Sequence, residues 1–225
     1  MTTSKLIVGN QNYSSWSMRP WLFVRHHKLD IGIEKLTLFT EETRDRLNEH
    51  FSNGKVPLLI DNGLEIWDTM AILEYLAEQY PQTQGWPEDV QARAVARAIC
   101  AEMHSSFSAL RNELPMNCRR YFPGYKLSEK GMRDVDRIQK IWNLCRTNYG
   151  QSGPWLFGDF SISDAMYAPV VMRFRSIDIE LDEISQYYYD TMHQSESVEE
   201  WLAAGKMEEE FLQEDELDWP SEPVD

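Results

Sequence analysis

The sequence predicts an α/β domain followed by an all-helical domain. In the first eighty residues, short apolar runs alternate with helical patterns. Residues 81–87 then contain two prolines and a glycine with no periodicity, which indicates a boundary. Beyond this boundary only helical spacing is found, up to an acidic end. We therefore expect one domain at residues 1–80, a linker at 81–87, and a helical domain at 88–225 with an acidic tail from about residue 207.

Composition and charge exclude some classes of partner. The 225 residues are 42% hydrophobic and 12% aromatic, which is typical of a folded globular protein. The net charge of −15 argues against nucleic acid, whose phosphates need a basic face, and against an anionic membrane surface. No apolar run approaches the length of a membrane span, and the first residues lack the apolar core of a signal peptide. Three scattered cysteines, Cys100, Cys118 and Cys145, favour buried reduced thiols in the cytoplasm.

The first strand and helix flank a turn rich in hydroxyl groups. Lys5–Gly9 is an apolar run typical of a buried strand, and a helix is expected over Met18–His27. Ser17 is the expected N-cap of this helix, with Pro20 in its first turn, where a missing N–H costs nothing. The turn between them, within Asn10–Trp21, therefore ends on an open helix N-terminus, which suits an anion.

The rest of the first domain is predicted from turn and cap signals. Asp61-Asn62-Gly63 is a hairpin signal between two strands. Asp68-Thr69 is expected to cap the helix that follows. Pro57 opens a strand, and the sequence leaves its cis and trans forms open. The further elements expected here are a strand at 33–39, a helix at 40–50 begun by Thr40, strands at 56–60 and 64–67, and a helix up to residue 80.

The second domain is predicted as a series of helices. Ser161-x-x-Asp164 resembles a capping box at a helix start. The tail from Asp215 is expected to be loose or laid over the surface. The expected helices are one long helix at 88–114 ended by Pro115, a second at 128–149, one from Ser161, and shorter ones at 182–194 and 197–204.

Four local motifs resemble the cytosolic glutathione S-transferase family. Residues 14–21, S-S-W-S-M-R-P-W, resemble the active turn of the zeta class, the maleylacetoacetate isomerases, with Ser14 at the active serine and Trp16 in place of a cysteine. The other matches are G-K-V-P-L-L-I-D at 54–61, W-D-T-M-A-I-L-E-Y-L at 67–76, and F-G-D-F-S-I-S-D at 157–164. The resemblance implies a thioredoxin-like first domain and a helical transferase second domain.

The resemblance also implies a binding site for glutathione, as a co-substrate. Val56, before a cis Pro57, would pair its backbone with the cysteinyl part, and Lys55 would lie near the glycyl carboxylate. Asp68 would bind the ammonium group of glutathione. Thr69 would bind the γ-glutamyl carboxylate through its hydroxyl and its backbone N–H at the helix start. Trp16 is included in this glutathione site without an individual role.

The implied activity is transfer of glutathione to a small electrophile, with the thiolate held by a serine hydroxyl. The family's zeta pattern selects Ser14 as the donor, and its delta-like pattern selects Ser15, so both stay open. The alternatives are a glutathione-dependent cis–trans isomerase and a non-catalytic binding protein on the same fold. The family also implies a homodimer. Candidates for the electrophile wall lie on the predicted long helix: Met103, His104, Phe107 and Arg111.

No metal is expected. Adjacent residues on a helix point in different directions, so His26 and His27 cannot share an ion, and we expect both on the solvated surface.

Overall fold

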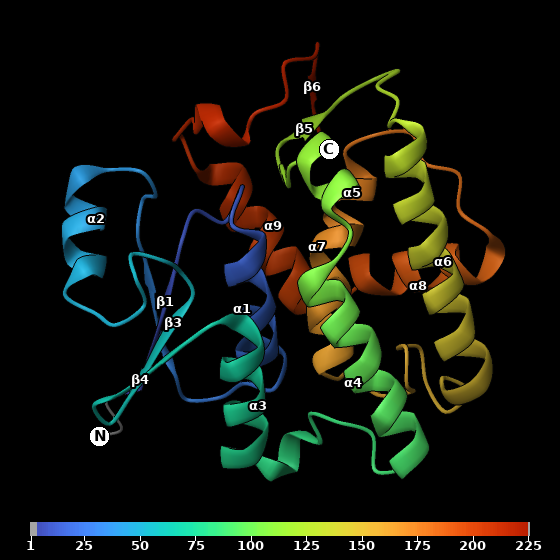
Figure 1. Ribbon diagram of the computed structural model, residues 1–225, viewed down its shortest axis with the longest axis horizontal. Coiled ribbons are helices and arrows are strands. Elements are labelled where there is room, and N and C mark those ends of the chain that lie inside the picture. Colours follow the sequence, from blue (N-terminus) through green and yellow to red (C-terminus); the bar gives the residue numbers. More distant parts are fainter. Residues whose placement is uncertain (1–3, 225) are drawn as a thin grey trace.

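The computed structural model describes residues 4–224 and begins with a small α/β unit (Figure 1). The alternation of apolar runs and amphipathic segments gives β1 (Lys5–Val8), α1 (Ser15–His26), β2 (Gly32–Lys35), α2 (Glu41–Asn48), β3 (Leu58–Asp61), β4 (Leu64–Trp67) and α3 (Thr69–Gln79).

The four strands form one mixed sheet in the order β2-β1-β3-β4. β1 pairs in parallel with β2 and antiparallel with β3, so that Leu6 lies opposite both Ile33 and Leu59. The predicted hairpin of β3 and β4 is confirmed. Its turn residues Asn62 and Gly63 have φ values of 50° and 86°, as a two-residue turn between twisted strands requires.

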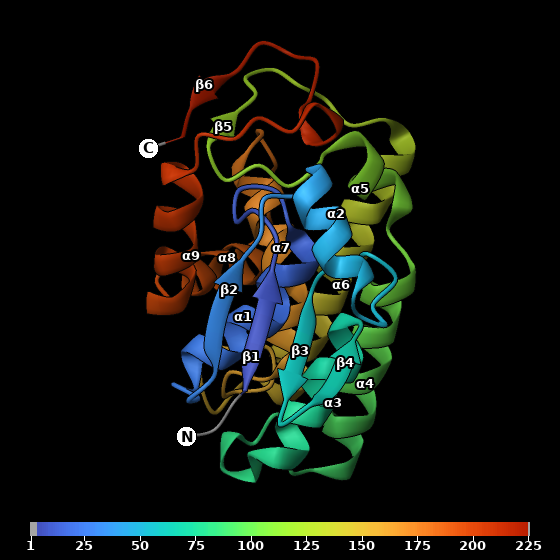
Figure 2. The ribbon, with the colours of Figure 1, turned by 90° about the vertical axis from the view of Figure 1, so that its left-hand side faces the viewer.

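The second half is helical apart from one short strand pair. Figure 2 shows that pair, β5 and β6, side by side near the end of the chain. The elements are η1 (Pro81–Thr83), α4 (Val90–Ser105), α5 (Ser108–Glu113), β5 (Arg120–Tyr121), α6 (Glu129–Tyr149), α7 (Ile162–Arg175), α8 (Glu183–His193), α9 (Glu196–Met207), η2 (Gln213–Asp215) and β6 (Glu222–Pro223).

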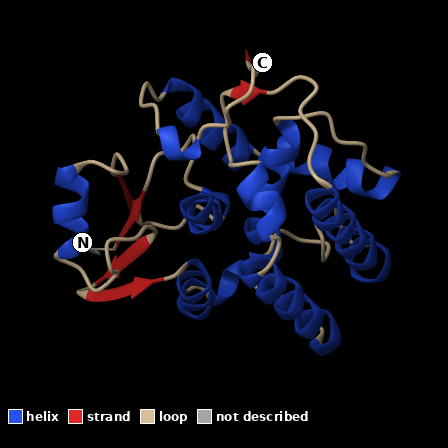
Figure 3. Cartoon of the chain, turned by 45° about the horizontal axis from the view of Figure 1, so that its top comes forward, coloured by secondary structure: helices blue, strands red, loops and turns tan. Residues whose placement is uncertain are grey.

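The sheet and the helices pack in layers through their apolar faces. In Figure 3 the sheet lies toward one side, with α2 on its outer face and the other helices beyond its inner face. The central helix α7, buried along nearly its whole length, packs against both α1 and α4. One buried cluster consequently runs from Leu6 in the sheet to Trp142 in α6. The domain division at residues 81–87 stays a prediction.

Helix α1 begins earlier than predicted. Ser14, not Ser17, is the N-cap residue, and Pro20 lies inside the helix rather than in its first turn. Ser17 is fully buried, and its Oγ accepts a hydrogen bond from the Gly9 N–H at 3.1 Å. The hydroxyl therefore serves the end of β1 and not the helix, a contact that local cap signals cannot predict.

The single long helix predicted at 88–114 is wrong, because the chain breaks between α4 and α5. Phe107 has a φ of 62°, in the left-handed region, and its side chain is buried. Ser105 turns its hydroxyl back onto the carbonyl of Ala101 at 2.9 Å, a bond that competes with helical pairing. The guanidinium of Arg111 then donates to the Ser106 carbonyl at 3.1 Å and closes the end of α4.

Other caps were predicted correctly. The Thr40 hydroxyl accepts from the Thr43 N–H at the start of α2, and Asp68 caps α3. Ser161 with Asp164 forms a full capping box at α7. Ser128 caps α6, a role that was not predicted.

Two further expectations need correction. The second strand was predicted to reach residue 39 but ends at Lys35, and Phe39 adopts a φ of 62°. His26 and His27 do not lie free on the surface: His26 stacks on Phe160 with ring centroids 4.0 Å apart, and His27 meets Phe23 edge-on at 4.6 Å. None of the described helices is long and apolar enough to cross a bilayer.

Candidate functional site

A cavity of about 430 Å³ lies where the two halves of the chain meet. It brings together seven residues predicted for the site, from α1, the loop before β3, the start of α3, and α4. Larger hollows lie over Arg25–Asp30 and elsewhere on the surface, but they hold none of the predicted residues. The walls of this cavity are Trp16, Ser52, Lys55, Val56, Pro57, Trp67, Asp68, Thr69 and His104.

The loop before β3 forms one wall. Its Val56–Pro57 peptide bond is cis, which settles the alternative that the sequence left open. Lys55 stands beside this bond and is exposed, so its ammonium group can reach an anion in the cavity.

Asp68 forms the opposite wall at the start of α3. Its φ of 73° places it in the left-handed region, which aspartate tolerates better than most residues. One carboxylate oxygen caps the helix by accepting from the Met70 N–H at 2.8 Å. The other lies 3.3 Å from Nε2 of His104 on α4, so this pair links the two halves across the cavity.

Thr69 uses its hydroxyl differently from the prediction. Pro20 has no N–H, so the carbonyl of Trp16, four residues earlier in α1, lacks its helical donor. The Thr69 hydroxyl donates to that carbonyl at 2.9 Å. A proline inside α1 thus creates an acceptor that ties α3 to α1, and the backbone N–H of Thr69 is left as the group that can face a carboxylate.

Trp16 has a role that sequence reasoning did not assign. The Arg19 guanidinium lies 4.1 Å from its ring centroid, and that of Arg111 lies 4.9 Å away. His104 meets the same ring edge-on at 5.2 Å. Each cation–π contact is worth roughly 0.5–2 kcal/mol. Trp16 therefore separates the cavity from two guanidinium groups and holds both in place.

The positive charge behind Trp16 is buried. Arg19 is fully buried, and within residues 4–224 neither terminal nitrogen has a hydrogen-bond partner; its Nε donates to the Met166 carbonyl at 3.1 Å. Burial lowers the pKa of Arg19, and the neighbouring Arg111 and Arg173 lower it further. The guanidinium groups of Arg19 and Arg111 thus lie against a residue of the cavity wall, where their charge favours an anion.

The two predicted thiolate donors lie just behind the cavity wall. Ser14 and Ser15 are each 8% exposed, at the start of α1, and neither is among the residues that line the cavity. The Ser14 hydroxyl lies 2.8 Å from the hydroxyl of Ser17. Which serine faces a ligand stays a prediction.

The predicted electrophile wall is only partly brought together. His104 lines the cavity, and Arg111 reaches the Trp16 ring and donates to the Met103 carbonyl. Met103 and Phe107 are 1% and 5% exposed and belong to the buried cluster.

Two family models match the chain. The model of the glutathione S-transferase N-terminal domain matches residues 13–79, and that of the glutathione S-transferase C-terminal domain matches residues 93–204. The chain belongs to the glutathione S-transferase family. The thioredoxin-like first domain and the helical second domain are those of this family.

Two relatives in this glutathione S-transferase family are similar to parts of the chain. A probable maleylacetoacetate isomerase of Caenorhabditis elegans is 31% identical over 112 residues, which are 50% of this chain and 52% of the relative. Glutathione S-transferase F14 of Arabidopsis thaliana is 27% identical over 168 residues, 71% of this chain and 62% of the relative. The matched part of the chain thus spans between about half and two thirds of these two relatives.

Two crystal structures share the fold. A glutathione transferase homologue from Burkholderia gl BGR1, solved with bound glutathione, has a TM-score of 0.67 at 21% identity and covers 90% of this chain and 98% of its own. Unclassified glutathione S-transferase 2 from Bombyx mori has a TM-score of 0.68 at 20% identity, covering 90% and 94%.

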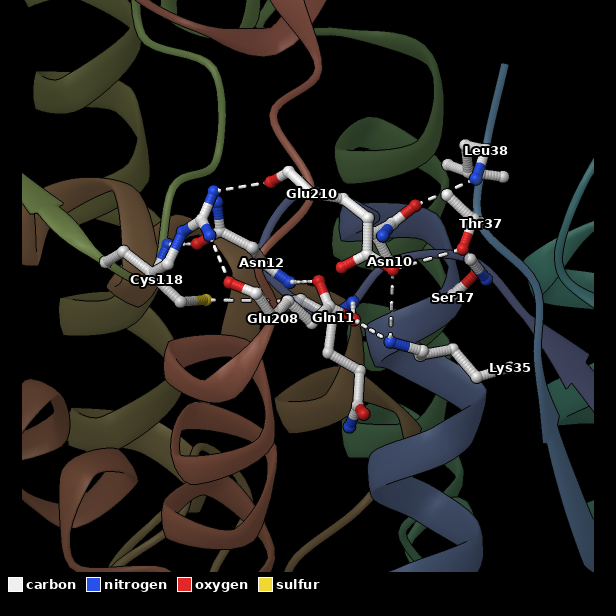
Figure 4. Close-up of polar contacts among 12 residues, drawn as sticks. Asn10, Gln11, Asn12, Ser17, Lys35, Thr37, Leu38, Cys118, Glu208 and Glu210 are labelled. Carbon is white, nitrogen blue, oxygen red and sulfur yellow. Dashed lines mark hydrogen bonds and ion pairs between the residues drawn. The ribbon is translucent and has the colours of Figure 1, made fainter. Parts of the chain in front are cut away.

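In this glutathione S-transferase fold, residues of the C-terminal segment form hydrogen bonds with the turn before Ser14 (Figure 4). The Glu208 carboxylate, whose side chain is 3% exposed, accepts from the N–H groups of Gln11 at 2.7 Å and Asn12 at 3.0 Å. Lys35 of β2 pairs with the same carboxylate at 3.0 Å. Further along, Glu216 accepts from the hydroxyl of Tyr13, the residue just before Ser14.

Of the two alternatives expected for the tail, loose or laid over the surface, the structure shows the second. The tail also helps to hold the turn before Ser14. Its β6 pairs with β5, and the Trp219 indole N–H donates to the Pro123 carbonyl at 3.0 Å. Sequence reasoning missed Glu208, because a run of three glutamates near the chain end carries no signal that one of them is buried.

The cysteines take no part in the cavity walls. Cys100, Cys118 and Cys145 are buried free thiols. Burial raises the pKa of Cys118 and that of Cys145 to about 12, so both are protonated and unreactive, as predicted.

Proposed function

We propose that this protein binds glutathione in the 430 Å³ cavity and ionises its thiol with the Ser14 hydroxyl, for attack on a small electrophile. The observation that carries the proposal is the assembly of Lys55, Val56 and Asp68 around one cavity at the start of α1. Lys55 suits the glycyl carboxylate, and the Asp68 carboxylate suits the ammonium group. The Thr69 N–H at the start of α3 suits the γ-glutamyl carboxylate.

The chemistry needs only modest stabilisation of the thiolate. An unperturbed thiol has a pKa of about 8.5, and lowering it by two units takes about 2.7 kcal/mol. A hydrogen bond from a hydroxyl to a charged group contributes ~1.5–3 kcal/mol. A helix start contributes up to ~2 kcal/mol, and the guanidinium groups of Arg19 and Arg111 add positive potential. A serine at the start of α1 therefore suffices without a separate base.

Ser14 and Ser15 can be separated by substitution. Successive helical residues point about 100° apart, so one position faces the sulfur better than the other. Ser14→Ala should lower kcat by roughly 10- to 150-fold, the equivalent of one charge-assisted hydrogen bond, with little change in KM for glutathione. Ser15→Ala is the matched control, and the reverse pattern would make Ser15 the donor.

The first experiment is retention on immobilised glutathione, followed by conjugation of a generic electrophile. Retention with turnover supports the transferase. Retention without turnover would favour a non-catalytic binding protein, and neither retention nor turnover would refute the glutathione site.

A second candidate is glutathione-dependent cis–trans isomerisation. It is favoured by the similarity to a probable maleylacetoacetate isomerase over half of the chain. Isomerisation of a maleyl-type substrate, with and without glutathione, tests it directly. In both activities the thiolate is the attacking group, so Ser14→Ala should impair both.

We also propose that the protein is a cytoplasmic homodimer. Its cysteines are free thiols, as a reducing compartment requires. Phe51 and Trp67 are 76% and 43% exposed and pack on each other beside the cavity, and the nearby Leu64 is 51% exposed. Light scattering after gel filtration measures the mass, and a monomer would refute the dimer.

A further inference from the structure

Ser17 lies between the end of β1 and the predicted thiolate donor. It is fully buried, so water cannot reach its hydroxyl. Its Oγ is 3.1 Å from the Gly9 nitrogen and 2.8 Å from the Ser14 Oγ. Ser17 belongs to the motif of residues 14–21 but was given no role at the site, and it is not among the residues that line the cavity.

The protons of these groups can be assigned by valence. A backbone N–H only donates, so Ser17 Oγ accepts from Gly9. In the structure the Ser14 hydroxyl donates to Ser17 Oγ at 2.8 Å. A hydroxyl has one proton and two acceptor positions, so this bond can reverse only if both hydroxyls rotate. Without a ligand, Ser14 donates to Ser17. If Ser14 turns its proton to a sulfur, Ser17 can donate to Ser14 in its place.

We propose that Ser17 is a positioning residue for the thiolate donor, and the proposal rests on the proposed function. The bound state is a relay in which Gly9 N–H donates to Ser17, Ser17 to Ser14, and Ser14 to the glutathione sulfur. The proton of the glutathione thiol passes to solvent water when the thiolate forms, whereas neither hydroxyl loses its proton and both only rotate. Each donated bond polarises the next, so Ser14 becomes a stronger donor to the thiolate than an isolated serine.

The first member of the relay is fixed in place. A Cβ at Gly9 would lie 2.7 Å from Cδ1 of Leu38, so this backbone packs directly against a side chain that follows β2. The direction of the Gly9 N–H is therefore set by the sheet, and Ser17 passes that direction on to Ser14.

The test measures the pKa of the bound glutathione thiol, from the ultraviolet absorbance of the thiolate against pH. Ser17→Ala should raise this pKa and lower kcat/KM near neutral pH by roughly 2- to 12-fold, the range of one hydrogen bond, with KM for glutathione little changed. In the Ser14→Ala background, Ser17→Ala should have no further effect, since its only route to sulfur is lost. Ser17→Cys keeps a group of similar size but a weak donor, and should also raise the pKa.

An unchanged thiol pKa in either folded Ser17 variant, with an active wild type, overturns the relay alone. Additive effects of the two serine substitutions also overturn it, because Ser17 would then act without Ser14. If the wild-type protein does not ionise bound glutathione at all, the proposed function fails and the relay with it. Ser15→Ala is the control for loss of a hydroxyl in the same turn.

Discussion

The buried carboxylate of Glu208 offers the most direct test of how the turn before Ser14 is held. Glu208→Ala removes the acceptor of the Gln11 and Asn12 N–H groups and leaves both without their partner. Each buried donor left unsatisfied costs about 1–3 kcal/mol, so the pair costs about 2–6 kcal/mol. The Lys35 ion pair, with its lysine side chain 38% exposed, adds at most about 1 kcal/mol. The bond from the Arg119 guanidinium to the main-chain carbonyl of Glu208 is untouched.

The assay is urea unfolding at constant pH, with the midpoint and the slope m fitted separately. Glu209→Ala is the matched control, because Glu209 is exposed and its substitution removes the same charge. It should change stability by no more than about 0.5 kcal/mol. Glu208→Gln keeps one acceptor oxygen and should lie between the two. The explanation is refuted if Glu208→Ala and Glu209→Ala have the same midpoint at equal m.

Two other predictions concern contacts of α1. Thr69→Val removes the donor to the Trp16 carbonyl with little change in volume. The free energy of unfolding, measured with urea, should fall by about 1–2 kcal/mol, and KM for glutathione, measured by steady-state kinetics, should rise. An unchanged KM and an unchanged unfolding midpoint would contradict the tie between α1 and α3. Burial, and secondarily His26, lower the pKa of His27 to about 4, whereas the unfolded chain titrates near 6.5. The unfolded state therefore binds the proton first as pH falls, so stability is lost between about pH 6.5 and 4, and His27→Gln should flatten this part of the stability profile; parallel profiles would contradict it.

The sequence predicted the fold where local chemistry decides it. Asn62-Gly63 favours positive φ, so the turn between β3 and β4 could be placed at these residues, although β3 runs over Leu58–Asp61 and not over the predicted 56–60. Thr40 and Ser161 cap helices with groups only two or three residues away, and such signals lie within one window of sequence.

Where distant contacts decide the structure, the prediction failed. Ser17 resembles an N-cap, but its hydroxyl is occupied by Gly9 and the helix begins three residues earlier than predicted. The spacing of apolar residues continues through Phe107, so periodicity alone could not reveal the break that Arg111 and Ser106 close. The strand β5 exists only because the chain end pairs with it.

The site was predicted as a set of residues and not as a geometry. Lys55, Val56 and Asp68 line one cavity, which the motifs implied. The motifs could not show that Trp16 lies against two arginines, or that Pro20 frees a carbonyl for Thr69. These contacts depend on the packing of α1 against α3 and on the approach of Arg111 from α5 to the Trp16 ring.

The anchoring of Gln11 and Asn12 by Glu208 also orders the steps of folding. The two ends of this contact are 197 and 196 residues apart, and long-range closures of this kind form late. During synthesis the sheet strands and the start of α1 leave the ribosome long before Glu208 does. The turn that carries Ser14 can therefore take its final shape only after Glu208 has been made, and until then a nascent chain would lack a finished site.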